Sequence, residues 1–216
     1  MSYEFDETKA TPLCEIMGRN NSDKGSLNIS SSWHNYTTLY YSLFKNITDK
    51  TLRVFELGIG TNNPNIASNM GINGRPGASL YGWSEFFPNS KIFGADIDRN
   101  ILFNTDRIKT FYCDQTNPEI IQDMWNEPEL QDNFDIIIDD GLHLYHANFT
   151  FFENSIHKLN SKGYYIIEDI IQNDQHIFLN KSKEWETKYP ECTFTLINIP
   201  STNNRIDNNL LVIAKA

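Results

Sequence analysis

The sequence predicts an α/β fold built on a mostly parallel sheet of seven strands. Short apolar runs alternate with amphipathic stretches through the middle of the chain, and two further apolar runs follow near its end. Strands that alternate with helices are typical of a doubly wound, Rossmann-like sheet covered on both faces. Several of the runs end in a glycine turn or in acidic residues. Ligands of open α/β sheets bind at such strand ends, so we expect the functional site there.

The 216 residues are enough for one domain with a short extension. We expect a helical N-terminal extension over residues 1–50, because Tyr36–Phe44 carries apolar residues at helical spacing. Residues 51–216 would form the main domain. Apolar residues make up 39% of the chain, which suffices for a sizeable core.

Five strands and three intervening helices are expected in the first part of the main domain. The strands are Arg53–Gly58, Lys91–Asp96, Ile108–Cys113, Phe134–Ile138 and Tyr164–Ile167. The helices are Ser79–Phe87, which Pro88 ends, Pro118–Trp125 and Ala147–Leu159.

The last part of the chain follows a different pattern. A helix around Asn180–Tyr189, ended by Pro190, precedes two apolar runs, Cys192–Ile199 and Asn209–Ala214. The polar loop Pro200–Asn208 joins these runs, which predicts an antiparallel hairpin at one edge of the sheet.

Composition excludes several classes of function. The formal net charge of −10 argues against non-specific nucleic-acid binding, which needs Lys and Arg against the phosphate backbone. No apolar run approaches the roughly 18–20 residues that span a bilayer, and the N-terminus lacks the pattern of a signal peptide. The three cysteines are widely separated, so neither a disulfide framework nor a zinc motif is expected. We therefore expect a cytoplasmic protein. The oligomeric state stays open, a homo-oligomer included.

Two apolar runs end in adjacent carboxylates. Asp139 and Asp140 end the fourth expected strand, with His143 three residues on, and Glu168 and Asp169 end the fifth. Negative charge next to a core is costly unless a cation or a hydrogen-bonding ligand compensates it. Oxygen ligands suit hard cations such as Mg²⁺ and Mn²⁺. This edge of the sheet is therefore predicted to hold a divalent metal.

A glycine turn follows the first expected strand. Gly58 and Gly60 would let the backbone approach a ligand closely. A dinucleotide fingerprint needs a third glycine where this chain has Asn63, and an acidic residue at Glu56 better suits a ligand with an ammonium group. A tight turn without a ligand is the alternative.

Acidic residues also end the second and third expected strands. Asp96 could accept two hydrogen bonds from ribose hydroxyls, and Asp114 could accept one from an adenine amino group. Each acid taken alone is as consistent with a structural role. Three successive strand ends of this kind favour a nucleoside ligand.

Taken in order, these motifs resemble class I S-adenosylmethionine-dependent methyltransferases. The resemblance is closest to the metal-dependent sugar O-methyltransferases of macrolide tailoring and bacterial capsule biosynthesis, and it extends from about Ser22 to Asp169. The motifs that carry it are Glu56-x-Gly58-x-Gly60, Asp96, Asp114-Gln115, Asp139-Asp140-Gly-x-His143 and Glu168-Asp169, with Ser22-Asp23-Lys24-Gly25, His34-Asn-Tyr36 and Gly77-Ala-Ser79-Leu80 before Trp83.

The resemblance implies the following roles. S-adenosylmethionine and a divalent metal, Mg²⁺ or Mn²⁺, would be the cofactors, and a sugar, nucleotide-activated or capsular, would be the acceptor. The methionine moiety would be held by Glu56, Gly58 and Gly60, with Asp139 near it; the ribose by Asp96; and the adenine by Asp114 and Gln115. The metal ligands would be Asp140, Glu168 and Asp169. His143 would be the general base, acting with Asp140.

The residues leave several alternatives open. His146 could replace His143 as the base, and His34 could shape the acceptor pocket or only pack against a helix. The tyrosines around Tyr36 and Tyr40 suit the core or a dimer surface better than a sugar platform. An acceptor that is an amine or a phosphorylated small molecule is the second hypothesis. A nucleotide-binding module without chemistry is the third, and an NAD-dependent oxidoreductase is a weaker fourth.

Overall fold

The computed structural model describes residues 4–6, 8–25, 34–201 and 204–216. Residues 1–3, 7 and 26–33 of the expected N-terminal extension, and residues 202–203 of the expected C-terminal loop, lie outside the described residues. Among the described residues, no helix is both long and apolar enough to cross a membrane.

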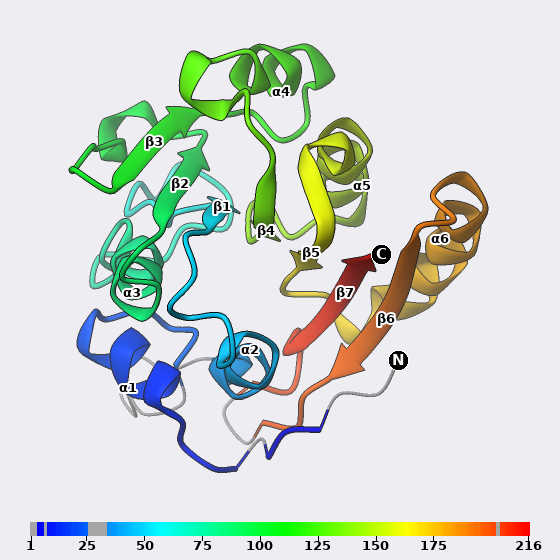
Figure 1. Cartoon of the computed structure of the whole chain (residues 1–216), viewed down its shortest axis with the longest axis horizontal. Coiled ribbons are helices and arrows are strands. Elements are labelled where there is room, and N and C mark those ends of the chain that lie inside the picture. The colour runs from blue at the N-terminus through cyan, green and yellow to red at the C-terminus, as the bar shows by residue number, and fades with distance from the viewer. Residues whose placement is uncertain (1–3, 7, 26–33, 202–203) are drawn as a thin grey trace.

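A seven-stranded sheet forms the centre of the molecule (Figure 1), in the order β3-β2-β1-β4-β5-β7-β6. The strands are β1 (Arg53–Leu57), β2 (Lys91–Asp96), β3 (Ile108–Tyr112), β4 (Phe134–Asp139), β5 (Leu159–Ile167), β6 (Cys192–Asn198) and β7 (Asn209–Lys215). Strands β1 to β5 are parallel, whereas β7 pairs antiparallel with both β5 and β6. The predicted fold class, including the antiparallel hairpin at one edge, is confirmed.

Helices cover both faces of this sheet (Figure 1). The helices are α1 (Pro12–Arg19), α2 (Tyr36–Phe44), α3 (Ala78–Phe86), α4 (Pro118–Trp125), α5 (Tyr145–Ser155) and α6 (Gln175–Lys188). Neighbouring residues of β1 alternate between the faces: Val54 packs in the core that α1, α2 and α3 share, and Phe55 in the core beneath α4, α5 and α6. The two helices of the N-terminal region therefore contribute to the main core and cover the sheet directly.

The pairing register of the central strands places their carboxyl ends at the same height in the sheet. Leu57 at the end of β1 pairs with Ala95 of β2 on one side and with Asp139 of β4 on the other. Asp139 in turn pairs with Ile167 at the end of β5. The residues that follow these strands consequently emerge at one edge of the sheet, as expected for a parallel sheet.

Three expected elements have boundaries that differ from the structure by more than one residue. The predicted helix Ala147–Leu159 begins earlier, at Tyr145, and ends at Ser155, and a 3₁₀ turn then leads directly into β5. Leu159 belongs to that strand and pairs with Phe134. The sequence pattern predicts a later start of the strand, at Tyr164, because polar residues follow Leu159. The last helix begins at Gln175 rather than near Asn180, because a 3₁₀ turn at Gln172–Asp174 leads into it.

Candidate functional site

A cavity of about 600 Å³ lies at the carboxyl ends of the parallel strands. This volume is within the range of about 300–1,000 Å³ that is usual for small-molecule sites. Residues from the ends of five strands line it: Gly58 and Gly60 after β1, Asp96 at the end of β2, Cys113, Asp114 and Gln115 after β3, Asp140, Gly141 and His143 after β4, and Asp169 after β5. The strand ends singled out in the sequence therefore meet at one cavity.

The glycine turn after β1 forms one wall of this cavity. Gly58 and Gly60 have φ angles of +82° and +81°, a region that L side chains rarely adopt. A Cβ at Gly58 would lie 1.8 Å from the carbonyl oxygen of Asp140, so the two loops approach too closely for any side chain. The next amide, Ile59 N–H, donates to Asp96 Oδ2 at 3.0 Å. This turn and Asp96 thus form one hydrogen-bonded unit.

Glu56 lies behind the wall and does not line the cavity. Its carboxylate is fully buried and accepts hydrogen bonds from the Ser79 hydroxyl and from Trp83 Nε1–H, the latter at 2.6 Å. Ser79 and Lys24, both in contact with Glu56, do line the cavity. Glu56 therefore reaches this edge through Ser79 and Lys24, and its contact with the methionine moiety, which the resemblance implies, stays a prediction.

Gln115 connects the third and fourth strand ends. Its Nε2–H donates to Asp139 Oδ1 at 2.6 Å, and its Oε1 accepts from Leu142 N–H at 2.7 Å. Asn148 Nδ2–H donates to the other Asp139 oxygen at 3.1 Å. Burial raises the pKa of Asp139 to about 7, against the opposing effect of the hydrogen bonds from Asn148 and from Gly141 N–H. Asp139 supports the loop from beneath and does not line the cavity, while Asp114 lines it with a carboxylate that accepts from Thr116.

Asp140, His143 and Asp169 form the charged end of the cavity. His143 Nε2 lies 3.1 Å from Asp140 Oδ1 and 3.2 Å from Asp169 Oδ2. One ligand atom from each of the three residues lies within 4.8 Å of the others, close enough for one metal ion. His143 and Asp169 both have positive φ angles, +59° and +56°. Such backbone costs about 1–3 kcal/mol for a residue other than glycine, and it clusters at functional sites.

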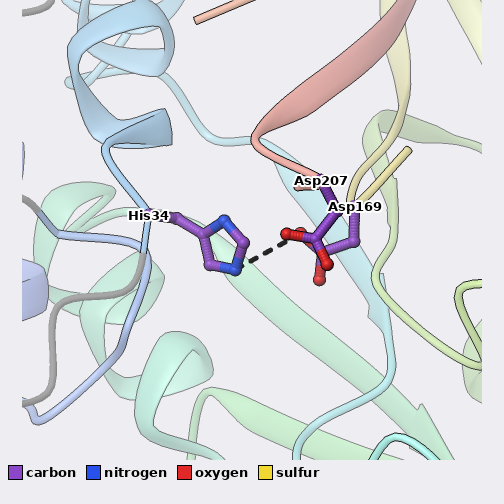
Figure 2. A group of neighbouring side chains, drawn as sticks. All are labelled: His34, Asp169 and Asp207. Carbon is purple, nitrogen blue, oxygen red and sulfur yellow. Dashed lines mark ion pairs between the residues drawn. The ribbon is translucent and has the colours of Figure 1, made fainter. Parts of the chain in front are cut away.

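His34 and Asp207 form a second group with Asp169, in which the His34 ring faces Asp169 and Asp207 lies beside it (Figure 2). His34 Nε2 is 3.4 Å from Asp169 Oδ1, and both residues are buried. His34 comes from the segment before α2 and Asp207 from the loop before β7. Asn204 Nδ2–H donates to Asp207 Oδ1 at 2.6 Å, which fixes that carboxylate. His34 lines the cavity and also stacks on Tyr36, the first residue of α2, with ring centroids 4.5 Å apart; its role in an acceptor pocket stays a prediction.

Glu168, expected as a third metal ligand, lies deeper than Asp140 and Asp169. Only 1% of it is exposed and it does not line the cavity. One carboxylate oxygen accepts from the Tyr40 hydroxyl and the other from the ammonium of Lys24. The same ammonium donates to Asp140 Oδ2. Lys24 therefore joins two of the three expected ligands.

Opposing effects set the charge states of this cluster. Burial opposes the ionisation of Asp140, but Lys24 and His143 outweigh it and hold the pKa of Asp140 below its usual range. Burial alone would lower the pKa of His143, yet Asp169 and Asp140 raise it to about 10. Burial and the neighbouring carboxylates raise the pKa of Glu168 well above its usual value. The cluster therefore has three carboxyl groups, Asp140, Glu168 and Asp169, against two basic side chains, Lys24 and His143, and the raised pKa of Glu168 shows that a further negative charge is costly here unless a cation compensates it.

Four contributors to this cluster were not predicted from the sequence. In the sequence pattern Lys24 is only part of a motif, and Asp207 is only part of a loop. The same pattern favours the core or a dimer surface for Tyr36 and Tyr40. They are buried, but their hydroxyls donate to Asp169 and Glu168 respectively. The available signal was the choice of tyrosine over phenylalanine at two positions four residues apart, on one face of a helix.

The sequence is similar to those of sugar O-methyltransferases. It is 33% identical over 159 residues to the 8-demethyl-8-(2-methoxy-alpha-L-rhamnosyl)-tetracenomycin-C 3'-O-methyltransferase of Streptomyces olivaceus, a match that covers 73% of this chain and 36% of the relative. It is 30% identical over 138 residues to the mycinamicin VI 2''-O-methyltransferase of Micromonospora griseorubida, and this match covers 63% of this chain and 32% of the relative. The chain thus spans about a third of the length of these relatives. No family model matches it.

Solved structures agree on the fold. The structure of the methyltransferase MycE in complex with Mg, SAH and mycinamycin VI superimposes with a TM-score of 0.70 at 24% identity, covering 96% of this chain and 55% of that one. Human methyltransferase-like protein 13 in complex with SAH superimposes with a TM-score of 0.54 at 16% identity, covering 79% of this chain and 74% of that one. The resemblance to class I S-adenosylmethionine-dependent methyltransferases is confirmed.

Proposed function

We infer that this chain, which is related to sugar O-methyltransferases and has the class I methyltransferase fold, transfers a methyl group from S-adenosylmethionine to a sugar hydroxyl with the help of a divalent cation. One observation carries the proposal. A single cavity is lined both by a glycine turn and Asp96 and by Asp140, His143 and Asp169.

The glycine-turn end fits a nucleoside methyl donor. Gly58 and Gly60 leave the wall free of side chains, and Asp96 offers a carboxylate at the position where nucleotide-binding α/β folds bind ribose. Asp114 lines the cavity after the next strand, which supports its proposed place beside the adenine. Gln115 and Asp139 would act indirectly, by fixing the loop that carries Asp140.

The charged end fits a hard divalent cation. Asp140 and Asp169 present carboxylate oxygens toward the cavity from two strand ends, and oxygen ligands are those that Mg²⁺ and Mn²⁺ prefer. A bound cation would stabilise the alkoxide of the acceptor hydroxyl, which is a poor nucleophile at neutral pH. We propose that Asp140 and Asp169 hold it from the cavity side, with Glu168 as the deeper ligand.

His143 is proposed as the general base. Its imidazole is next to both carboxylates and lines the cavity where an acceptor would enter. A pKa of about 10 keeps it protonated while Asp140 and Asp169 exert their full charge. The imidazole can accept a proton at neutral pH only when its pKa is lower than this. A cation bound to Asp140 and Asp169 would lower the pKa of His143, because it would compensate their negative charge.

His143→Gln is expected to lower turnover by about 10²–10⁴-fold, the usual contribution of a general base. Affinity for the demethylated cofactor should stay within about twofold, because the ion-pair partners of His143 are Asp140 and Asp169, which are proposed to hold the cation and not the cofactor. Turnover and calorimetric titration of the demethylated cofactor measure the two effects.

His146→Gln is the matched control, since His146 is exposed and does not line the cavity. Its turnover should equal that of the unmodified protein. Equal losses in both variants, or a loss only at His146, would contradict the assignment of the base.

The proposed acceptor is the hydroxyl of a small sugar. The names of the relatives specify rhamnosyl tetracenomycin and mycinamicin as acceptors, so a sugar already attached to an aglycone is the first candidate, ahead of a nucleotide-activated or capsular sugar. Release of the demethylated cofactor should be measured with rhamnosides, nucleotide sugars and small amines, each with added Mg²⁺. Methylation of any sugar class supports the proposal; methylation of amines alone, or of no acceptor at all, would contradict it.

A further inference from the structure

Lys24 occupies the space between the carboxylates proposed to bind the cation. Its ammonium donates to Asp140 Oδ2 and to Glu168 Oε2, and it lies 4.0 Å from Glu56 Oε1. Only 3% of the side chain is exposed. Three acidic groups from three different strand ends thus surround one lysine.

The backbone around Lys24 is anchored between α1 and α2. Lys24 N–H donates to the Ser22 hydroxyl, and its carbonyl accepts from Thr37 N–H at 3.3 Å. The preceding carbonyl, that of Asp23, accepts from His34 N–H at 3.0 Å. The backbone is therefore held in place, whereas the long flexible stem can move the ammonium without moving the chain.

Depth below the cavity surface distinguishes these residues. Lys24, Asp140 and Asp169 line the cavity, and Glu168 does not. Both Glu168 oxygens already have donors, Tyr40 on one and Lys24 on the other. A cation that enters from the cavity therefore meets the Lys24 ammonium before it can reach Glu168. A second positive charge beside that ammonium would be repelled strongly at this depth.

We propose that Lys24 is a tethered counter-ion that a divalent cation displaces from Glu168 and Asp140. In the metal-free protein the ammonium neutralises these buried acids and keeps them together. When the cation binds, it takes over both carboxylates and the lysine side chain moves away from them. Lys24 is a positioning residue, and it lowers the affinity for the metal because its ammonium competes for the same carboxylates. This inference rests on the metal site of the proposed function.

The test is the affinity of the whole protein for MnCl₂, measured by electron paramagnetic resonance of free Mn²⁺. Lys24→Met removes the competitor and should tighten Mn²⁺ binding by about tenfold or more, which corresponds to the loss of at least one charge-assisted hydrogen bond. The metal-free variant should also melt at a lower temperature, and Mn²⁺ should raise its melting temperature more than that of the unmodified protein.

Lys158→Met is the matched control. Lys158 is also buried, but its ammonium donates to the backbone carbonyls of Leu130 and Gln131, away from the carboxylates. This variant should lose stability without any change in Mn²⁺ affinity.

The outcomes separate this proposal from the function itself. Unchanged or weaker Mn²⁺ binding by Lys24→Met would overturn the competition while leaving the metal site in place. Absence of Mn²⁺ binding in the unmodified protein would overturn both. If Lys24→Met does not fold, acetylation of the unmodified protein with an amine-reactive ester, followed by mass spectrometry, decides the question. Modification of Lys24 should rise at least about threefold with saturating Mn²⁺ while that of Lys158 stays constant. No rise would overturn the proposal.

Discussion

Removal of divalent cations is expected to abolish methyl transfer while leaving cofactor binding intact. Stabilisation of a developing negative charge by one well-placed group is worth about 10²–10³-fold in rate, and a cation on two carboxylates should contribute at least as much. The reason is that the residues expected to hold the cofactor, the glycine turn and Asp96, differ from Asp140 and Asp169, which are proposed to hold the cation. The measurement is turnover after exhaustive chelation, followed by titration with Mg²⁺ and Mn²⁺.

Asp169→Asn should reproduce the effect of chelation in a single variant. The substitution removes one negative charge but keeps the size of the side chain, and added metal should not restore the rate. Asp123→Asn, an exposed carboxylate on α4, is the matched control and should behave as the unmodified protein. Full activity in rigorously metal-free protein would refute the role of the cation.

Gly58→Ala is expected to destabilise the protein by more than about 4 kcal/mol, or to prevent folding. The added Cβ would lie 1.8 Å from the carbonyl oxygen of Asp140 and 2.5 Å from its carbonyl carbon. These are backbone atoms of a loop held by Asp140 N–H to the carbonyl of Leu57, at 2.9 Å, so they cannot move aside as a flexible side chain could. Both the sheet edge and the proposed metal site depend on this close approach.

Gly71→Ala separates this clash from the cost of backbone conformation. Gly71 has a φ of +70°, similar to that of Gly58, but no heavy atom lies within 4 Å of the position that an added Cβ would take. The free energy of unfolding of the Gly71→Ala variant should fall by only about 1–2 kcal/mol, which is the cost of a left-handed backbone conformation for a residue with a side chain. Chemical denaturation of both variants gives the comparison. Equal losses at the two positions would show that the contact with Asp140 contributes nothing.

Local sequence patterns predicted most of the strands and helices of the fold. Each apolar run that ended in a glycine or a carboxylate was a strand of the sheet, and strand β2 and helix α4 have the boundaries expected from sequence. The start of β5 was not predictable in this way. Leu159 is followed by polar residues, and only its pairing with Phe134 across the sheet makes this segment a strand.

The site was predictable as far as chain direction determines it. Parallel strands put Asp96, Asp140 and Asp169 at one edge whatever the details of packing. The orientations of individual side chains depend on distant partners, and these are invisible in a local pattern. Glu56 turns away from the cavity toward Trp83, and Glu168 is held by Lys24, 144 positions away in the sequence.

The most direct test of the central claim is a crystal structure with Mn²⁺ and the demethylated cofactor, with the cation located by its anomalous signal. The account predicts a peak about 2.0–2.3 Å from carboxylate oxygens of both Asp140 and Asp169. The cofactor ribose should lie on Asp96 in the same cavity. A Mn²⁺ ion that contacts neither Asp140 nor Asp169, or a cofactor bound away from the glycine turn, would contradict the account.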